Sequence, residues 1–413
     1  MVKQGYKKTE VGVIPEDWES VALLSKCDLL NGLTYTPNDM ADNGLLVIRS
    51  SNVQNNQLVF SDNVYVDLTV ADEKLIKKDD IIICVRNGSA ALIGKCAKAS
   101  RDYTITFGAF MAVLRGENNG YIYQLLQQGT IQKHISKNSG ATINQITNGD
   151  FKTIFVPFPT DAKEQERIAE ALLDVDSMIS SLEKLIAKKK AVKQGTMQEL
   201  LTGKKRLPSF NGEWSKINLA KKSKIKARIG WQGLTTNEYL DSGYSYLVTG
   251  TDFVNGKIDW NNCHYVAKDR FDQDKNIQIQ NNDILITKDG SLGKTALVKG
   301  LNKPATLNSG VFVIRPIQES YDPTFVYYIL SSFVFKNFLD HLSAGSTIIH
   351  LYQKDISKFE FLMPPTIGEQ VAIASILSDM DKEIESFEQK LAKTRQIKQG
   401  MMQQLLTGKI RLV

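Results

Sequence analysis

Two stretches of the chain place apolar residues at alternating spacings of four and three positions. This 3.5-residue period predicts helices that bury a narrow seam against each other, as in a coiled coil. Outside the seam both stretches are rich in charged residues, which favours exposed helices over the alternative, a pair packed within one globular core. The predicted seam residues are Ile168, Leu172, Val175, Ile179, Leu182 and Ile186 in the first stretch, and Ile373, Leu377, Met380, Ile384, Phe387 and Leu391 in the second.

The residue types at both ends of these stretches agree with two long helices. Prolines precede each stretch, and Gly203 and Gly408 follow a Leu-Thr pair at the other end, where a helix C-cap belongs. About 38 residues at 1.5 Å per residue predict a helix of roughly 57 Å. The prolines are Pro157, Pro159, Pro364 and Pro365.

The two helices belong to one unit of sequence that occurs twice. Residues 164–207 align without a gap to residues 369–412, and about 24 of the 44 positions are identical. A weaker match continues upstream, where Asp80-Ile81-Ile82-Ile83 pairs with Asp283-Ile284-Leu285-Ile286. Each copy therefore combines a nearly identical helix with a divergent region of about 150 residues.

The divergent regions have the pattern of β-rich domains. Short apolar runs alternate with Asn, Asp and Gly turns, and a helical stretch follows in each copy, Tyr121–His134 and Pro323–His341. We expect an α+β fold in which two long helices form an antiparallel coiled coil between two β-rich globular domains, with internal pseudo-two-fold symmetry. The predicted segments are 1–156, 157–207, 208–361 and 362–413. The predicted strands include Leu45–Ile48, Ile81–Val85, Phe110–Leu114, Tyr246–Val248, Ile284–Thr287 and Val311–Ile314.

Composition narrows the class of protein only slightly. The chain has 413 residues and a formal net charge of +6, which permits a polyanionic partner without requiring one. It has no apolar run of about eighteen residues and begins with a polar segment, so we expect a cytoplasmic protein. The four cysteines and four histidines are scattered, and the sequence therefore predicts no metal site.

Catalytic motifs are absent from the sequence. Gly293-Lys294-Thr295 resembles the end of a phosphate-binding loop, but Lys288 stands where the first glycine is required, and the first copy has Cys96 in place of Thr295. The only Pro-Pro pair lies in residues 363–366, outside the Asn/Asp-Pro-Pro-aromatic pattern of an adenine methyltransferase. The acidic stretch 271–275 lacks the spacing of a nuclease centre and is interpreted as a solvated loop. We expect a non-catalytic protein.

The uneven divergence of the two copies is informative. Nearly identical helices must satisfy the same contacts twice, whereas divergent domains on one fold are suited to two different targets. A bipartite DNA site is the foremost ligand of this kind. The alternative is a coiled-coil scaffold with two protein- or peptide-binding domains.

The chain resembles the specificity subunit of type I restriction–modification systems over its whole length. The resemblance is carried by TEVGVIPEDW (9–18), PFPTDAKEQERIAEALLDVD (157–176), PPTIGEQVAIASILSDMD (364–381) and the two LLTGK ends (200–204 and 405–409). It implies two target-recognition domains that each read half of a split site in double-stranded DNA. It also implies helices that act as spacer and docking surface for two methyltransferase subunits and, through them, two restriction/translocase subunits. S-adenosylmethionine, ATP and Mg²⁺ would then belong to the partner subunits, with no cofactor on this chain.

Candidate DNA contacts are polar residues in the predicted loops, because Arg and Lys read guanine or phosphate and Asn and Gln read adenine. The loops at 86–89 and 288–291 occupy equivalent places in the two copies and differ in sequence, as expected for readers of different half-sites. The alternative is that these are ordinary polar turns. The candidates are Arg49, Asn52, Arg86, Asn87, Ser89, Lys95, Lys98 and Lys137 in the first copy, and Trp231, Gln232, Lys288, Asp289, Ser291, Lys294 and Lys299 in the second.

Overall fold

Two units make up the chain, and each contains one β-rich region with half of each long helix. The computed structural model describes residues 4–138, 144–343 and 350–413. Unit 1 consists of residues 1–183 and 389–413, and unit 2 of residues 184–388. The division differs from the four predicted segments because both long helices pass from one unit into the other.

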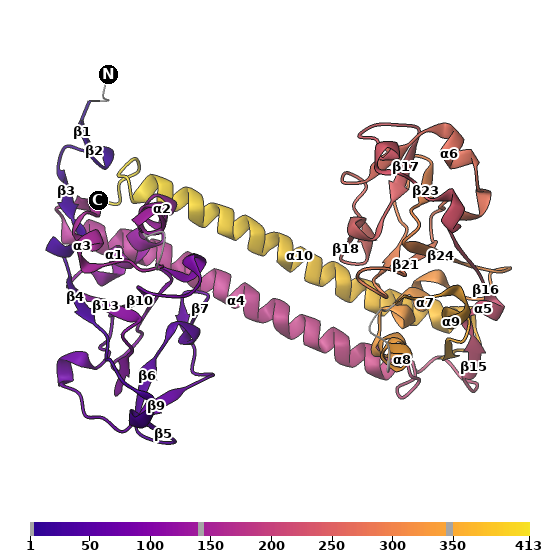
Figure 1. Ribbon diagram of the computed structural model, residues 1–413, viewed down its shortest axis with the longest axis horizontal. Coiled ribbons are helices and arrows are strands. Elements are labelled where there is room, and N and C mark those ends of the chain that lie inside the picture. The colour runs from indigo at the N-terminus through magenta and orange to yellow at the C-terminus, as the bar shows by residue number, and fades with distance from the viewer. Residues whose placement is uncertain (1–3, 139–143, 344–349) are drawn as a thin grey trace. The chain divides into compact units, whose positions relative to one another are not determined.

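The β-rich region of unit 1 is built on two four-stranded sheets (Figure 1). The first, in the order β11-β10-β13-β4, is antiparallel throughout, and all four residues of its strand β10 are buried. The second has the order β12-β6-β9-β5, with β12 and β6 parallel. The strands are β4 Asp28–Asn31, β5 Met40–Ala41, β6 Leu45–Ile48, β9 Val64–Val66, β10 Ile81–Cys84, β11 Cys96–Lys98, β12 Ile105–Phe107 and β13 Met111–Arg115.

Short strand pairs complete unit 1 around these sheets. One hairpin stands at its start, a second lies beside the sheets, and a third pair joins the first part of the region to the strand that precedes the long helix. These strands are β1 Tyr6–Thr9 with β2 Gly12–Pro15, β7 Val53–Gln54 with β8 Gln57–Leu58, and β3 Trp18–Ala22 with β14 Phe155–Pro159.

Unit 2 repeats this plan. Its antiparallel sheet has the order β16-β24-β21-β22, and its second sheet, in the order β20-β17-β23, again contains a parallel pair. The strands are β15 Ser215–Asn218, β16 Ser223–Ala227, β17 Ser245–Val248, β18 Phe253–Val254, β19 Lys257–Ile258, β20 His264–Val266, β21 Ile284–Thr287, β22 Thr295–Leu297, β23 Ala305–Leu307, β24 Val311–Pro316 and β25 Glu360–Met363. Short helices α5 (Leu219–Lys222) and α6 (Lys268–Asp272) lie between them.

The helical stretch after the strands is two helices in each unit, where the sequence predicted one. In unit 2 the break falls at Ser331-Ser332. The Ser332 hydroxyl donates to the Ile329 carbonyl (2.6 Å) and accepts from the Val334 amide (3.2 Å), so it replaces the backbone bonds of a continuous helix. The helices are α1 Asn119–Leu126 and α2 Gly129–Asn138 in unit 1, α7 Pro323–Leu330 and α8 Phe333–Ser343 in unit 2, and the short α3 Asn148–Lys152 and α9 Gln353–Ile356.

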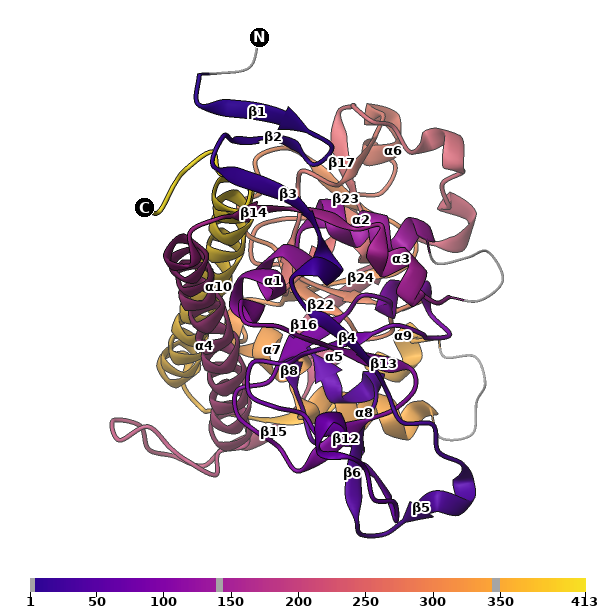
Figure 2. The ribbon, with the colours of Figure 1, turned by 90° about the vertical axis from the view of Figure 1, so that its left-hand side faces the viewer.

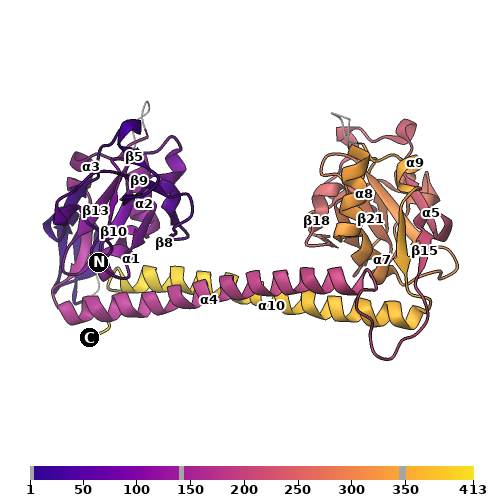
Figure 3. The ribbon, with the colours of Figure 1, turned by 90° about the horizontal axis from the view of Figure 1, so that it is seen from below.

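The long helices α4 (Ala162–Leu200) and α10 (Ile367–Leu405) have 39 residues each and run antiparallel (Figures 1 and 3). In unit 1, Glu183 pairs with Arg395 at 2.6 Å. In unit 2, Lys193 pairs with Asp381 at 2.5 Å. The fold class predicted from the sequence is thus confirmed, with two β-rich regions and a packed pair of long helices.

All twelve predicted seam residues are at least partly buried. Leu172 and Leu377 are fully buried, because each joins the core of its own unit as well as the seam. Val175, Ile179, Met380, Phe387 and Leu391 are only partly buried. The helix pair is therefore sealed most tightly where a β-rich region covers it.

Both long helices end as the glycines predict. Gly203 and Gly408 have φ angles of +71° and +67°, in the left-handed region that favours glycine. The amides of Lys205 and Ile410 then bond back to the carbonyls of Glu199 and Gln404 at 3.2 and 3.1 Å. Each bond gives a partner to a carbonyl in the last turn, which the end of a helix otherwise leaves unpaired.

Candidate nucleic-acid interface

In unit 1, the loops at one end of the antiparallel sheet come together. Arg86 follows β10, and its backbone amide donates to the carbonyl of Phe110, which precedes the neighbouring strand β13 (3.2 Å). Asn87 Nδ2 donates to Ser50 Oγ (2.9 Å), and Lys95 Nζ donates to the Ser50 carbonyl (3.3 Å). We call Arg49–Ser51, Arg86–Ser89, Lys95 and Phe110 the unit 1 loop cluster.

Unit 2 places a matching set of loops at the same end of its sheet. The Lys288 amide donates to the Gly310 carbonyl (2.9 Å), as Arg86 does to Phe110. Lys294 Nζ lies 3.4 Å from the Gly250 carbonyl, as Lys95 lies against Ser50. We call Thr249–Thr251, Lys288–Ser291, Lys294 and Gly310 the unit 2 loop cluster.

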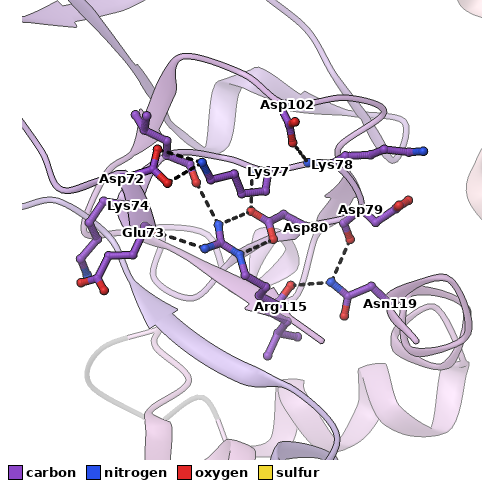
Figure 4. A network of polar contacts seen from close by, with 12 residues as sticks. Asp72, Glu73, Lys74, Lys77, Lys78, Asp79, Asp80, Asp102, Arg115 and Asn119 are labelled. Atoms are coloured by element: carbon purple, nitrogen blue, oxygen red, sulfur yellow. Dashed lines mark hydrogen bonds and ion pairs between the residues drawn. The ribbon is translucent and has the colours of Figure 1, made fainter. Parts of the chain in front are cut away.

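In each antiparallel sheet, the central strand (β10 or β21) is fixed by a buried ion pair at the end away from the loop cluster. Figure 4 shows the ion pair of unit 1. Asp80, immediately before β10, is 1% exposed and holds Arg115 by two bonds, Nε to Oδ1 at 2.8 Å and Nη2 to Oδ2 at 2.6 Å. This contact raises the pKa of Arg115 above its usual value. Arg315 and Asp283 repeat the arrangement in unit 2, with both distances at 2.7 Å. The strand that ends in the loop cluster is therefore held rigidly at its start.

Four of the DNA-contact candidates predicted from the sequence are not part of the loop clusters. Lys98 pairs with Asp79 at 2.5 Å, and Lys299 Nζ donates to Asn282 Oδ1 at 2.6 Å; both are at the ion-pair end of their sheets. Asn52 is fully buried, and its Oδ1 accepts from the Arg49 amide at 3.0 Å. Gln232 is 5% exposed. These positions do not suit DNA contacts, because each polar group is either paired within the fold or shielded from solvent.

Two further candidates concern side chains that the structure does not describe. Lys137 and Trp231 lie in helical segments, and their side chains are outside the described part of the chain. Residues 139–143 and 344–349, which lie in two stretches of sequence rich in Gly, Ser and Thr, are outside it as well. Described residues near these two stretches contact the loop clusters. Asn144 Nδ2 donates to the Gly88 carbonyl (2.9 Å), and the Leu351 amide donates to the Lys288 carbonyl (3.1 Å).

Phe110 belongs to the unit 1 loop cluster and was missed by sequence reasoning. The apolar pattern placed it at the start of a buried strand, but β13 begins at Met111 and Phe110 is 54% exposed. The preceding Gly108-Ala109 was a turn signal that could have indicated an exposed loop tip.

The described residues offer no site for several other kinds of chemistry. The amides of Gly293 and Lys294 bond internally to the Thr287 carbonyl and Oγ1, both at 2.9 Å, so they do not cradle a phosphate. No three described His, Cys, Asp or Glu side chains are grouped as metal ligands would be. Burial raises the pKa of the Cys96 thiol to about 12, which makes it a poor nucleophile. No helix in the described part of the chain is long and apolar enough to cross a membrane.

Each β-rich region is attached to the helix pair by a buried glutamate at the start of a long helix. In unit 1, Glu164 accepts from Trp18 Nε1 (3.1 Å) and from Nε of Arg411 (2.6 Å), a residue that follows α10 in the chain. In unit 2, Glu369 accepts from Trp214 Nε1 (3.3 Å) and from Nε of Arg206 (2.7 Å), a residue that follows α4 in the chain. Both glutamates are 0% exposed. We call these two sets the tryptophan anchors.

A second attachment uses an ion pair across the helix seam. In unit 1, Lys398 Nζ lies 2.7 Å from Asp176, and Gln124 of α1 donates to that aspartate (3.1 Å). Helix α1 accordingly lies between the sheet and α4 (Figure 2). In unit 2, Lys193 takes the place of Lys398, and Tyr328 of α7 donates to Asp381 at 2.8 Å. We call these the seam ion pairs.

The two attachments explain why parts of the helices are identical in both copies. The glutamates, aspartates, lysines and arginines concerned stand at the same positions of the repeat, so each unit uses the same contacts to hold a different β-rich region. The fold and the matched loop clusters thus define a duplicated recognition protein whose two surfaces have different chemistry.

Comparisons with known proteins agree with this class. The model of the type I restriction modification DNA specificity domain matches residues 15–194 and 234–395. The type I restriction enzyme EcoKI specificity subunit of Escherichia coli is 24% identical over 428 residues, which is 97% of this chain and 90% of that protein. The crystal structure of the S subunit of a type I restriction–modification system from M. genitalium has a TM-score of 0.62 at 18% identity, and covers 94% of this chain and 96% of that one.

A further solved chain, from work on complex assembly and conformational transition of the type I restriction–modification system, has a TM-score of 0.54 at 15% identity. It covers 96% of this chain and 99% of that one. Because the family model matches most of the residues, the chain belongs to the family of type I restriction–modification DNA specificity subunits. It is the DNA specificity component of such a system and is not itself catalytic, as the sequence predicted.

Proposed function

We propose that each unit reads one half of a bipartite DNA site through its loop cluster, and that the helices space the two readers. The observation that carries this proposal is the pair of loop clusters, which occupy the same place on the same sheet yet present different side chains. Arg86 and Asn87 stand in unit 1 where Lys288 and Asp289 stand in unit 2. Base edges are read by donors and acceptors of this kind, so the two clusters suit different base sequences.

The helices are also proposed to dock two methyltransferase subunits. Several exposed positions are identical in the two copies although no internal packing requires it, which suggests that an outside partner meets the same surface twice. Two restriction/translocase subunits would bind through the methyltransferases, and S-adenosylmethionine, ATP and Mg²⁺ would act on these partners. They include Ala187 with Ala392, Lys188 with Lys393, Gln194 with Gln399, Gly195 with Gly400, and Gln198 with Gln403.

A salt titration of DNA binding tests the proposal against a protein-binding scaffold. The subunit, assembled with its methyltransferase, should bind a duplex that contains its methylation site. The logarithm of the affinity should fall by about 0.9 per phosphate contact for each tenfold rise in salt concentration. A duplex of scrambled sequence is the matched control. A shallow slope, or equal binding of both duplexes, would favour the scaffold.

Exchange of one β-rich region should change one half-site only. Replacing residues 20–150 by the equivalent region of a relative keeps Trp18, Glu164 and both long helices, so the tryptophan anchor is preserved. Mapping of methylated adenines should then show a new first half-site beside an unchanged second one. Exchange of 215–355 is the reciprocal control. If both half-sites changed together, the units would not be independent readers.

A further inference from the structure

One arginine in the unit 1 loop cluster has no hydrogen-bond partner for its guanidinium among the described residues. The Arg86 guanidinium makes no hydrogen bond or ion pair with any residue in the described ranges, and the residue is exposed. Its central carbon lies 5.2 Å from the centroid of the Phe110 ring. A ring face restrains the guanidinium by cation–π attraction without occupying an N–H group.

Three other long polar side chains of the cluster, those of Arg49, Asn87 and Lys95, already make contacts within the fold. Arg49 Nη2 pairs with Asp62 at 2.8 Å. The Asn87 amide is used at both ends, donating to Ser50 Oγ (2.9 Å) and accepting from the Ser89 amide (3.0 Å). Within the described ranges, Arg86 therefore offers a guanidinium that contacts the Phe110 ring and whose N–H groups are unpaired.

We propose that Arg86 reads a guanine in the half-site of unit 1, with Phe110 as the residue that positions it. A guanidinium matches the O6 and N7 acceptors that guanine presents in the major groove, and this bidentate contact discriminates against the other bases. Phe110 is held in place because its carbonyl accepts from the amides of both Val85 and Arg86, at 3.0 and 3.2 Å. This inference rests on the proposed function and adds the base that unit 1 selects.

Unit 2 lacks this arrangement at the matching position. Gly310 replaces Phe110 and has no side chain, while Lys288 replaces Arg86. The Lys288 ammonium faces the ring of Phe312, which is 3% exposed and belongs to the core. An ammonium is a point charge without the planar fork of a guanidinium, so this form of guanine reading is expected of unit 1 alone.

The test compares Arg86→Ala, Arg86→Lys and Phe110→Leu with the parent protein, each expressed with its methyltransferase. Mapping of methylated adenines gives the base preference, and a salt titration of DNA binding gives the affinity and the salt slope. The half-site assigned to unit 1 by exchange of 20–150 should contain a required guanine. In Arg86→Ala, preference for that guanine should fall by about 10- to 100-fold, and other bases should be accepted there. Arg86→Lys should lose the preference while retaining binding strength. Phe110→Leu, which keeps apolar bulk but removes the ring face, should lose part of the preference for guanine.

Lys288→Ala is the matched control and should leave the unit 1 half-site unchanged. The inference is overturned if no guanine is required in that half-site, or if Arg86→Ala keeps the preference. It is also overturned if Arg86→Ala weakens binding equally at all sequences and lowers the salt slope by about one contact, because Arg86 would then contact phosphate. Each of these results leaves the proposed function intact, since independent half-site reading is decided by the domain exchange.

Discussion

Leu172→Lys is expected to destabilise unit 1 by about 3–5 kcal/mol, the range for an uncompensated buried charge. Leu172 is 0% exposed and packs in both the helix seam and the core of unit 1, so a lysine there has neither water nor a partner. Urea unfolding should show a lowered midpoint, and gel filtration with the methyltransferase should show loss of assembly.

The adjacent residue provides the control for this prediction. Leu173 is 42% exposed, so Leu173→Lys removes a leucine from the same turn of helix without burying a charge. Its unfolding midpoint and assembly should stay close to those of the parent protein. The second copy offers the same comparison, because Leu377 is 0% exposed and Ile376 is 37% exposed. A soluble Leu172→Lys protein that assembles fully would show that the seam assignment is wrong.

The regular parts of the fold were predictable because their signals are local or periodic. The 3.5-residue period identified α4 and α10, and strands such as β6 and β21 were predicted with their observed bounds. The break between α7 and α8 was not predicted, because it depends on the Ser332 hydroxyl taking over backbone bonds in a stretch that is otherwise apolar. The spacing of apolar residues does not show where a side chain replaces a backbone hydrogen bond.

The long-range attachments were beyond sequence reasoning. Trp18 ends one of the motifs that carry the family resemblance, but its bond to Glu164 spans 146 positions, and the Arg411 bond to the same carboxylate spans 247. Only the fold brings these groups together. The repeat did hold a signal, because Glu164 and Arg411 both match charged residues of the other copy, which is unusual for surface charges in a diverging sequence.

The loop residues show how far residue type alone can go. Arg86 and Asn52 were equal candidates by type, yet Arg86 is exposed and its guanidinium has no hydrogen-bond partner among the described residues, whereas Asn52 is buried as a turn cap. A comparison of the copies could have separated them, since Asp252 caps the matching turn of unit 2 by accepting from the Thr249 amide at 2.7 Å. Asn52 and Asp252 accept the same backbone bond, from the residue three positions earlier, and this shared bond indicates capping.

Insertion of seven residues into both long helices is expected to lengthen the DNA spacer by up to about three base pairs. Seven residues preserve the 3.5-residue seam period and add about 10 Å of helix. DNA rises about 3.4 Å per base pair. The insertions belong after Glu183 and after Lys390, which keeps the Glu183–Arg395 pair and both seam ion pairs within their own units. Methylome mapping should then show both half-sites unchanged and farther apart.

An insertion of five residues at the same two points is the control, because it breaks the seam period and turns one unit about the helix axis. It should methylate less than the seven-residue variant at any spacing. Three added base pairs also turn the second half-site by about 100° around the DNA, since one helical turn takes about 10 base pairs. Methylation by the seven-residue variant should therefore be slower than by the parent protein, even at its preferred spacing. If that variant stayed active with unchanged spacing, the helices would not set the distance between half-sites, and the partner subunits would have to.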